Sequence, residues 1–298
     1  MKPIRDSWAI SVDITSVCTR SCAHCTRGMR HVHEHDHHSI GWVMNALDSL
    51  RGWPGAVVII GGEPTLHPDF RAICIYLAAR FPKAQCALFT MGGPSFDRHQ
   101  DIIYETFGTI SYHDHHNPAI HEPILIAGND IGISKPDRDR LINRCWLQHN
   151  WCPGVTPRGA FACEVMATID KLMCGPGGWY PKEGWWNKAD FADQRERYCH
   201  LCGIPWGIPG SPDTQTNEYI SEWWLNHRYG RLLRNYTIIT PELYAKMRRE
   251  RPKHVHYAKP DGVHYWKHVH PAAWLRMKRA GAMYRLKKLW WWLEDMVP

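Results

Sequence analysis

Long hydrophobic runs are absent from this sequence of 298 residues. No window approaches the roughly eighteen uninterrupted apolar residues that a transmembrane helix needs. The first seven residues also lack the apolar stretch of a secretory signal. We therefore expect a cytoplasmic protein that has no membrane partner. Because 44% of its residues are apolar, the chain can bury a sizeable core, which excludes a disordered protein.

Acidic side chains are scarce in the last quarter of the chain. Residues 223–298 hold 16 of the 36 Lys and Arg but only 5 of the 29 Asp and Glu, a net charge of +11. Residues 1–222 hold 20 basic and 24 acidic side chains, a net charge of −4. Basic residues interleaved with Trp, Tyr and His are typical of surfaces that bind nucleic acid or another polyanion, and we expect such a partner at this tail. The alternative is the solvated face of a helix.

Short apolar, β-branched runs alternate with helical patterns over the first half of the chain. The strands that we expect are residues 8–14, 56–60, 85–89, 109–112 and 123–126. Between them, residues 40–51 and 69–80 carry apolar side chains at helical spacing. This alternation predicts an α/β fold with a mostly parallel sheet, open or closed as a barrel.

Composition divides the chain into three parts. We expect a first domain over residues 1–140, a small Cys-rich domain over residues 141–222, and a basic, aromatic-rich, partly helical C-terminal region over residues 223–298. The middle part is rich in Cys, Gly, Pro and Trp and has little periodicity, which is typical of a small domain ordered by metal.

Eleven cysteines are present, and nine of them are clustered. Cytoplasmic thiols stay reduced, so clustered cysteines indicate metal or redox chemistry. The two others, Cys74 and Cys86, sit in apolar runs and are expected in the core. Cys18, Cys22 and Cys25 form a C-x3-C-x2-C loop after the first strand. Three thiolates on one loop can each bind one iron of a four-iron cluster and leave the fourth iron open. A zinc site and a purely structural cluster are the alternatives.

A second motif, Gly61-Gly62-Glu63-Pro64, follows the strand over 56–60. Two glycines let a backbone approach a ligand closely, and a glutamate there can accept hydrogen bonds from an ammonium group. Together with the cysteine loop, this turn resembles the radical S-adenosylmethionine (SAM) superfamily. The resemblance covers residues 8 to about 128.

The resemblance implies a partial (β/α)6 TIM-like barrel with its site at the carboxyl ends of the strands. It implies a [4Fe-4S] cluster on Cys18, Cys22 and Cys25. The residues expected near SAM are Gly61, Gly62, Glu63, Pro64, His24, Thr90 and Ser111. In this superfamily an electron, from a reductant such as flavodoxin or ferredoxin, cleaves SAM to a 5′-deoxyadenosyl radical that abstracts hydrogen from a substrate C–H bond. We expect His113 and Asp114, which follow the fourth strand, to act in catalysis. The histidine-rich run over residues 31–38 is not expected to form a dedicated metal site.

The remaining cysteines surround a Gly-turn hairpin at Gly159 and end in a C-x2-C knuckle. This pattern resembles the auxiliary iron-sulfur domain called SPASM, and in particular its shortened form, Twitch. The ligands that the resemblance implies for a second iron-sulfur cluster are Cys145, Cys163, Cys199 and Cys202, with Cys152 and Cys174 as alternates. A zinc ribbon has the same spacing and stays open as an alternative.

The basic tail decides the expected substrate. A nucleobase in DNA or RNA, either unmodified or already modified, is our first expectation, with isomerisation or oxidation of a substituent as the outcome. The alternative is a radical SAM enzyme that modifies a peptide or a small molecule. A second alternative is a non-enzymatic iron-sulfur or zinc protein that binds nucleic acid.

Overall fold

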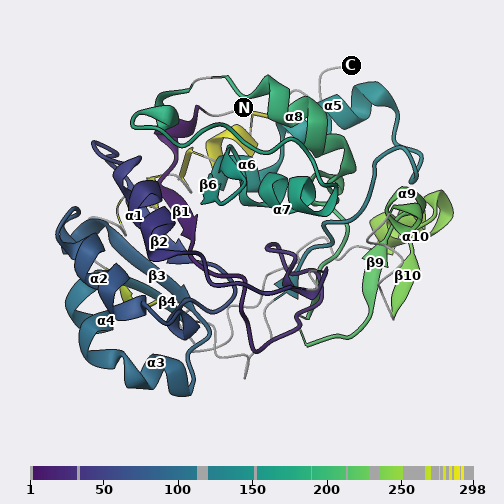
Figure 1. Ribbon diagram of the computed structural model, residues 1–298. Helices are drawn as coiled ribbons and strands as arrows, with labels where there is room; N and C mark the ends of the chain where they lie inside the picture. Colours follow the sequence, from purple (N-terminus) through teal and green to yellow (C-terminus); the bar gives the residue numbers. More distant parts are fainter. Residues whose placement is uncertain are drawn as a thin grey trace.

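The computed structural model describes residues 3–31, 34–112, 120–150, 153–188, 190–212, 214–227, 235–250 and 266–269, and short pieces between residues 275 and 291. Its main sheet has seven strands in the order β11-β4-β3-β2-β1-β6-β7 (Figure 1). The strands are β1 (Ala9–Asp13), β2 (Ala56–Ile60), β3 (Cys86–Thr90), β4 (Thr109–Tyr112), β6 (Gly154–Thr156), β7 (Gly159–Phe161) and β11 (Trp266–Val269).

The centre of this sheet is parallel. Strands β4, β3, β2, β1 and β6 pair in parallel, while β7 and β11 are antiparallel to their neighbours at the two edges. The carboxyl ends of parallel strands meet at one edge of a sheet, so the loops that follow Asp13, Ile60 and Thr90 gather there. The α/β class that the sequence predicts is confirmed, and the sheet is consistent with a partial barrel.

Helices connect the parallel strands and extend beyond them. They are α1 (Ile40–Asp48), α2 (Phe70–Ala78), α3 (Pro94–Arg98), α4 (Gln100–Thr106), α5 (Lys135–Asn143), α6 (Trp146–Asn150), α7 (Glu164–Leu172), α8 (Ala192–Tyr198), α9 (Glu222–Asn226) and α10 (Pro241–Glu250). Two small sheets pair β9 (Glu218–Ile220) with β10 (Tyr236–Ile238), and β5 (Ile120–His121) with β8 (Ser211–Pro212). Within the described residues, no helix is long and apolar enough to cross a membrane.

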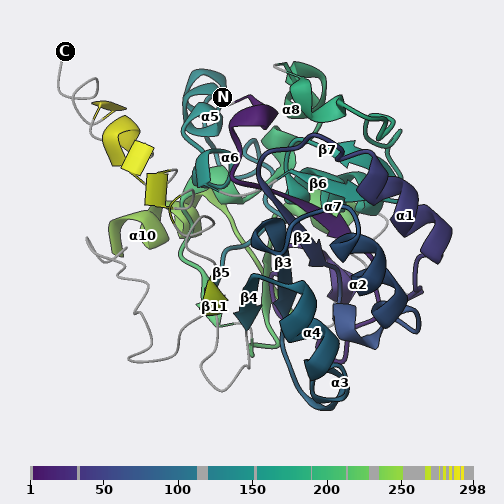
Figure 2. The same cartoon turned by 90° about the vertical axis from the view of Figure 1, so that its left-hand side faces the viewer.

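Apolar side chains on the two faces of the sheet belong to two separate clusters. On one face, Val12, Ile59 and Leu88 belong to the large core that also holds apolar side chains of α1, α2 and α4. These helices lie together against the strands in the second view (Figure 2). The other face carries Ala9, Ala56, Val58 and Ala87 in a smaller cluster. Because side chains alternate along a strand, Ser11 and Asp13 of β1 point to this second face.

Helix α7 covers the second face where β1 meets β6. A Cβ built on Gly154 of β6 would lie 3.1 Å from Ser11 Oγ and 3.8 Å from Glu164 Cα. The first turn of α7 therefore sits directly over the end of the sheet (Figure 1). The hairpin expected around Gly159 is confirmed as β6 and β7, and Gly159 adopts a φ of 118°. The hairpin joins the Cys-rich part of the chain to the N-terminal sheet.

One expected strand does not form. Residues 123–126 are buried but pair with none of the described strands. Their backbone groups bond to loops instead: Ile124 O accepts from Gly203 N at 3.1 Å, and Leu125 O accepts from Ser221 N at 3.0 Å. An apolar run predicts burial but not the partner of its backbone, and the strand prediction over 123–126 was wrong for that reason.

Candidate functional site

The glycine turn is bonded to the segment that leads into the first cysteine loop. Gly62 N donates to Thr15 O at 2.7 Å, and Glu63 N donates to Val17 O at 2.8 Å. A Cβ on Gly62 would lie 2.2 Å from Val17 O, and one on Gly61 would lie 2.3 Å from Thr15 O. Only glycine allows this approach. The two motifs on which the resemblance rests are therefore joined by backbone hydrogen bonds.

The carboxylate of Glu63 is anchored to the end of β3. It is buried and accepts hydrogen bonds from Thr65 Oγ1 at 2.6 Å, Thr90 Oγ1 at 2.7 Å and Met91 N at 2.8 Å. Burial raises the pKa of Glu63, and these donors oppose that effect. Thr90, expected near SAM, thus contacts Glu63 directly. Pro64 begins the single 3-10 turn Pro64–Leu66 that follows.

The three cysteines of the first loop are half-buried. Burial raises the pKa of Cys18 to about 11, and the charges of Cys25 and Glu63 act in the same direction. Arg20 N donates to Cys18 Sγ at 3.4 Å. In the described parts of the chain, no three His, Cys, Asp or Glu side chains are arranged to hold a metal ion. The donor chemistry, three thiols on one loop, is what fits an iron-sulfur cluster here.

His24 precedes Cys25 and is buried. Its backbone has a φ of 54°, an uncommon value for a residue with a side chain. Its ring lies 5.4 Å from the ring of Tyr219 in β9, and its backbone N donates to Glu218 Oε1 at 3.2 Å. Burial lowers the pKa of His24 to about 4, so the ring is neutral near pH 7.

Glu218 is a functional candidate that the sequence did not reveal. It is fully buried, and Oε2 lies 3.0 Å from His31 Nε2 while Oε1 lies 3.7 Å from Arg30 Nη1. Burial alone would raise the pKa of Glu218, but the neighbouring His31, His24 and Arg30 hold it below its usual range. Through these contacts Glu218, which belongs to β9, holds Arg30 and His31 of the segment after Cys25 against that strand. No motif surrounds it, and no sequence signal could have found it.

A buried arginine links the two cysteine groups. Arg27, two residues after Cys25, donates to Asp13 Oδ1 at 2.6 Å and to Glu164 Oε2 at 2.8 Å. Glu164 directly follows Cys163 and opens α7. The side chains of Arg27 and Glu164 are 5% and 3% exposed, so the pair is desolvated. The first loop and the second cysteine group thus share one ion pair.

Four cysteines of the second group influence one another's pKa, and one of them, Cys163, caps the start of α7. The charges of Cys145, Cys199 and Cys163 all act on Cys202, and the charge of Cys145 acts on Cys163 and Cys199. Burial raises the pKa of each of these thiols. They come from the residue before α6, the N-cap of α7 and the two ends of the turn Cys199–Leu201. This is the ligand set that the sequence analysis preferred.

The other candidates are placed differently. Cys152, His113 and Asp114 lie outside the described residues. Cys174 is exposed after α7, with a φ of 51°. Ser111 lies in β4, paired in register with Phe89 of β3. Cys74 and Cys86 are fully buried in the core, as expected.

The described histidines of the 31–38 run have separate partners. His31 contacts Glu218, as described above. His35 Nδ1 lies 2.7 Å from Ser16 O, and His37 Nδ1 lies 3.0 Å from Thr15 Oγ1. The rings of His38 and Trp42 meet edge to face at 5.3 Å. These contacts spread the histidines along the loop.

No protein-family model and no curated protein matches this sequence. Among solved structures, the chain is similar to BtrN in complex with AdoMet and 2-DOIA, at 14% identity and a TM-score of 0.43, over 65% of this chain and 88% of that one. It is also similar to BtrN in an open conformation, at 16% identity and a TM-score of 0.40, over 80% and 97% of the two chains. These are distant likenesses.

Proposed function

We propose that this chain is a radical SAM enzyme. One observation carries the proposal: the Gly61-Gly62-Glu63 turn is held by two backbone hydrogen bonds against the segment that leads to Cys18. The superfamily that the sequence resembles needs this pairing, because one motif binds the cluster and the other binds the amino group of SAM. The two glycines leave no side chain between the turn and the cysteine loop.

The residues present would divide the work as follows. Cys18, Cys22 and Cys25 would hold a [4Fe-4S] cluster, which supplies the electron for cleavage of SAM when a flavodoxin or ferredoxin reduces it. The Gly61-Gly62 backbone would lie against the methionine end of SAM, and Glu63, fixed by Thr90, would keep the turn in place. Ser111 would lie toward the ribose.

A second iron-sulfur cluster is proposed on Cys145, Cys163, Cys199 and Cys202. Four thiols, of which Cys163, Cys199 and Cys202 are buried and Cys145 is half-buried, are the donor set of either iron-sulfur or zinc. Iron and zinc analysis after anaerobic reconstitution separates the two. We expect about eight irons per chain in the wild type and about four after replacement of these four cysteines by Ala. Zinc that disappears with these cysteines, while iron stays at about four, would identify a zinc ribbon.

For the substrate, we place a small polar molecule ahead of a nucleobase. The reason is a cavity of about 570 Å³ beside the cysteine loop, lined by charged groups that include Asp13, Arg27 and Lys171. This volume suits a small ligand. Nucleobase modification is the second candidate, favoured by the +11 charge of residues 223–298.

The direct test is anaerobic reconstitution with SAM and dithionite. 5′-Deoxyadenosine is measured alone and with pools of amino acids and amino sugars, peptides, RNA or DNA. Stimulation by one pool identifies the substrate class. A chain that holds iron and binds nucleic acid but never cleaves SAM would overturn the proposal and support a non-enzymatic role.

A further inference from the structure

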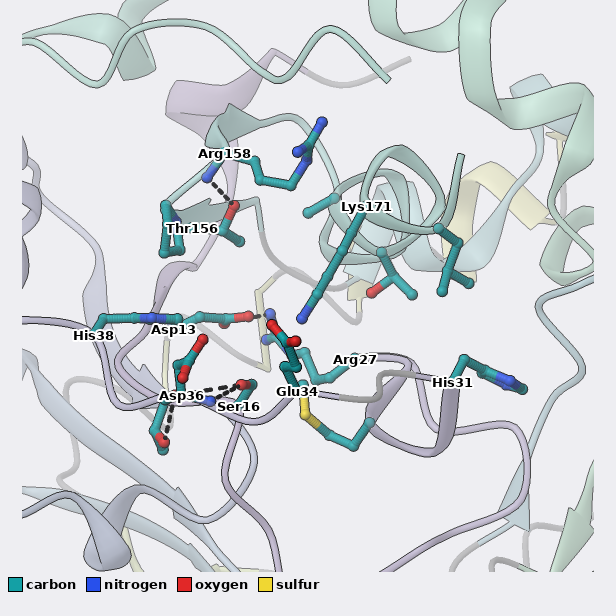
Figure 3. A pocket seen from close by; sticks show the side chains of 16 residues that line it. Asp13, Ser16, Arg27, His31, Glu34, Asp36, His38, Thr156, Arg158 and Lys171 are labelled. Carbon is teal, nitrogen blue, oxygen red and sulfur yellow. Dashed lines mark hydrogen bonds and ion pairs between the residues drawn. The ribbon is translucent and has the colours of Figure 1, made fainter. Parts of the chain in front are cut away.

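A charged cavity lies between the segment after the first cysteine loop, the turn of the β6–β7 hairpin, and α7 (Figure 3). Its volume is about 570 Å³. Asp13 and Arg27 form one wall, Thr156 and Arg158 come from the hairpin, and Lys171 comes from the last turn of α7. Pockets of this size commonly enclose small molecules, with orientation set by a few polar groups.

Three of the charged side chains in the wall, Asp13, Arg27 and Arg158, are already paired. Arg27 is held by Asp13 and Glu164, as described above. Arg158 Nε lies 2.5 Å from Asp170 Oδ2, and its guanidinium also donates to Gly175 O. These groups form a fixed frame, and a ligand would have to break buried ion pairs to use them.

Lys171 is different. It makes no hydrogen bond and no ion pair with any residue that the structure describes, and its side chain extends into the cavity (Figure 3). Burial lowers its pKa, while Asp13 and Asp36 act in the opposite direction. A half-buried ammonium group that faces a cavity without a direct partner is suited to receive an anionic group of a ligand.

Two carboxylates of the loop line the same cavity as Lys171, and the charge of one of them, Asp36, acts on Lys171. Glu34 and Asp36 line the cavity and are exposed, and neither carboxylate forms a hydrogen bond or an ion pair with a described residue. His38, also in the wall, adds no positive charge, because burial lowers its pKa to about 4. The available groups are therefore one ammonium from α7 and two carboxylates at the loop.

We infer that this cavity binds a small zwitterion, whose carboxylate or phosphate pairs with Lys171 and whose ammonium group pairs with Glu34 and Asp36. Amino acids, other amino-substituted carboxylic acids and amino-sugar phosphates all carry one ammonium group and one carboxylate or phosphate. If the proposed function holds, this molecule is the substrate, because the cavity borders Thr15 and Ser16, which lead into the cysteine loop. That identification rests on the proposed function, whereas the binding site itself does not.

Calorimetric titration of the reconstituted full chain without SAM tests the site. The probes are 4-aminobutanoate, 6-aminohexanoate and 8-aminooctanoate, whose charge separations increase stepwise, and 4-aminobutyl phosphate supplies the phosphate form. Hexanoate and hexylamine, which carry one charge each, are the matched controls. We expect the best zwitterion to bind about tenfold or more tightly than either control, because each control lacks one of the two charged groups that pair with the wall.

Variants separate a specific site from general charge attraction. Lys171→Met should weaken the best zwitterion about tenfold or more, Lys171→Arg less, and Glu34→Gln with Asp36→Asn should make it bind like hexanoate. Lys135→Met is the control, since Lys135 is exposed on α5 and paired with Asp139, and it should change nothing. Circular dichroism checks that each variant is folded.

The outcomes are distinct. Equal binding of zwitterions and controls, or unchanged binding in folded Lys171→Met, would overturn the inference. Displacement of the best zwitterion by SAM alone, with no loss in the Glu34 and Asp36 variants, would also overturn it. Zwitterion binding in a protein that never cleaves SAM would contradict the proposed function and leave the site standing. SAM cleavage by a protein that binds no zwitterion would overturn the binding site and leave the proposed function standing.

Discussion

Arg27 connects the segment after the first cysteine loop to Glu164, which follows Cys163 of the second cysteine group. It is buried between Asp13 and Glu164, and no other described cation lies within ion-pair distance of either carboxylate. Removal of one partner from a buried ion pair leaves an uncompensated charge, which costs about 3–5 kcal/mol. We expect Arg27→Gln to lower the free energy of unfolding by that amount in urea. Arg71→Gln, which breaks the exposed pair with Asp101, should lower the free energy of unfolding far less, because exposed ion pairs are screened by solvent. Equal losses in the two variants would contradict the assignment.

Glu218 gives a prediction about pH. Its pKa is lower in the folded protein than in the unfolded chain, so its contribution to stability is present above the unfolded pKa and is lost as pH falls through the folded value. Wild type should therefore lose stability relative to Glu218→Gln when the pH falls below about 4.5, near the usual carboxyl range. Urea unfolding between about pH 7 and pH 2 measures this difference, because the loss falls between the unfolded pKa and the lower folded pKa. A constant difference between the two proteins across that range would rule out the ionised Glu218.

At the scale of elements, the glycine turn and the cysteine loop act as one unit. Gly62→Ala would place a Cβ 2.2 Å from a carbonyl oxygen of the loop, so one of the two segments must move. We expect this variant to lose most 5′-deoxyadenosine formation while it retains the iron of the second group. Gly41→Ala is the matched control, because nothing lies within 4 Å of its Cβ in α1, and alanine there should stabilise the helix by about 0.5–1 kcal/mol. Normal SAM cleavage by Gly62→Ala would contradict the role of the turn.

Local patterns predicted much of the fold. The four central strands and two of the helices were recognisable because apolar periodicity is a property of neighbouring residues. The preferred second ligand set came from the resemblance to the Twitch domain and stays a prediction, because no three His, Cys, Asp or Glu side chains among the described residues are arranged to hold a metal ion. Contacts across the chain were not accessible: His24 meets Glu218 across 194 residues, and Arg27 meets Glu164 across 137. The sequence analysis did not single out Lys171, because only the tertiary fold shows that it faces a cavity.

At the scale of the whole molecule, the +11 charge of residues 223–298 is the basis for the second substrate candidate, a nucleobase in DNA or RNA. The described basic residues of this region include Arg279, Arg285 and Lys287, and Lys287 Nζ lies 3.5 Å from His149 Nδ1 at α6. Arg276 lies outside the described residues.

If the tail binds phosphates, affinity for DNA or RNA should fall steeply with salt. We test this with Gln at six positions: Arg276, Lys278, Arg279, Arg285, Lys287 and Lys288. This variant should flatten the salt slope by up to about 0.9 for each phosphate that the tail no longer neutralises. SAM cleavage without substrate should persist. Wild-type protein that shows no salt-dependent binding near physiological ionic strength would remove the nucleobase from consideration.

The central claim is that Cys18, Cys22 and Cys25 hold the cluster that cleaves SAM. The most direct measurement is 5′-deoxyadenosine production by the triple Ala variant at these positions, with iron content measured on the same sample. Cys74→Ala is the control, because that thiol is buried in the core away from both groups. We predict no 5′-deoxyadenosine and about four remaining irons in the triple variant, and normal cleavage in the control. Wild-type levels of 5′-deoxyadenosine from the triple variant would contradict the account.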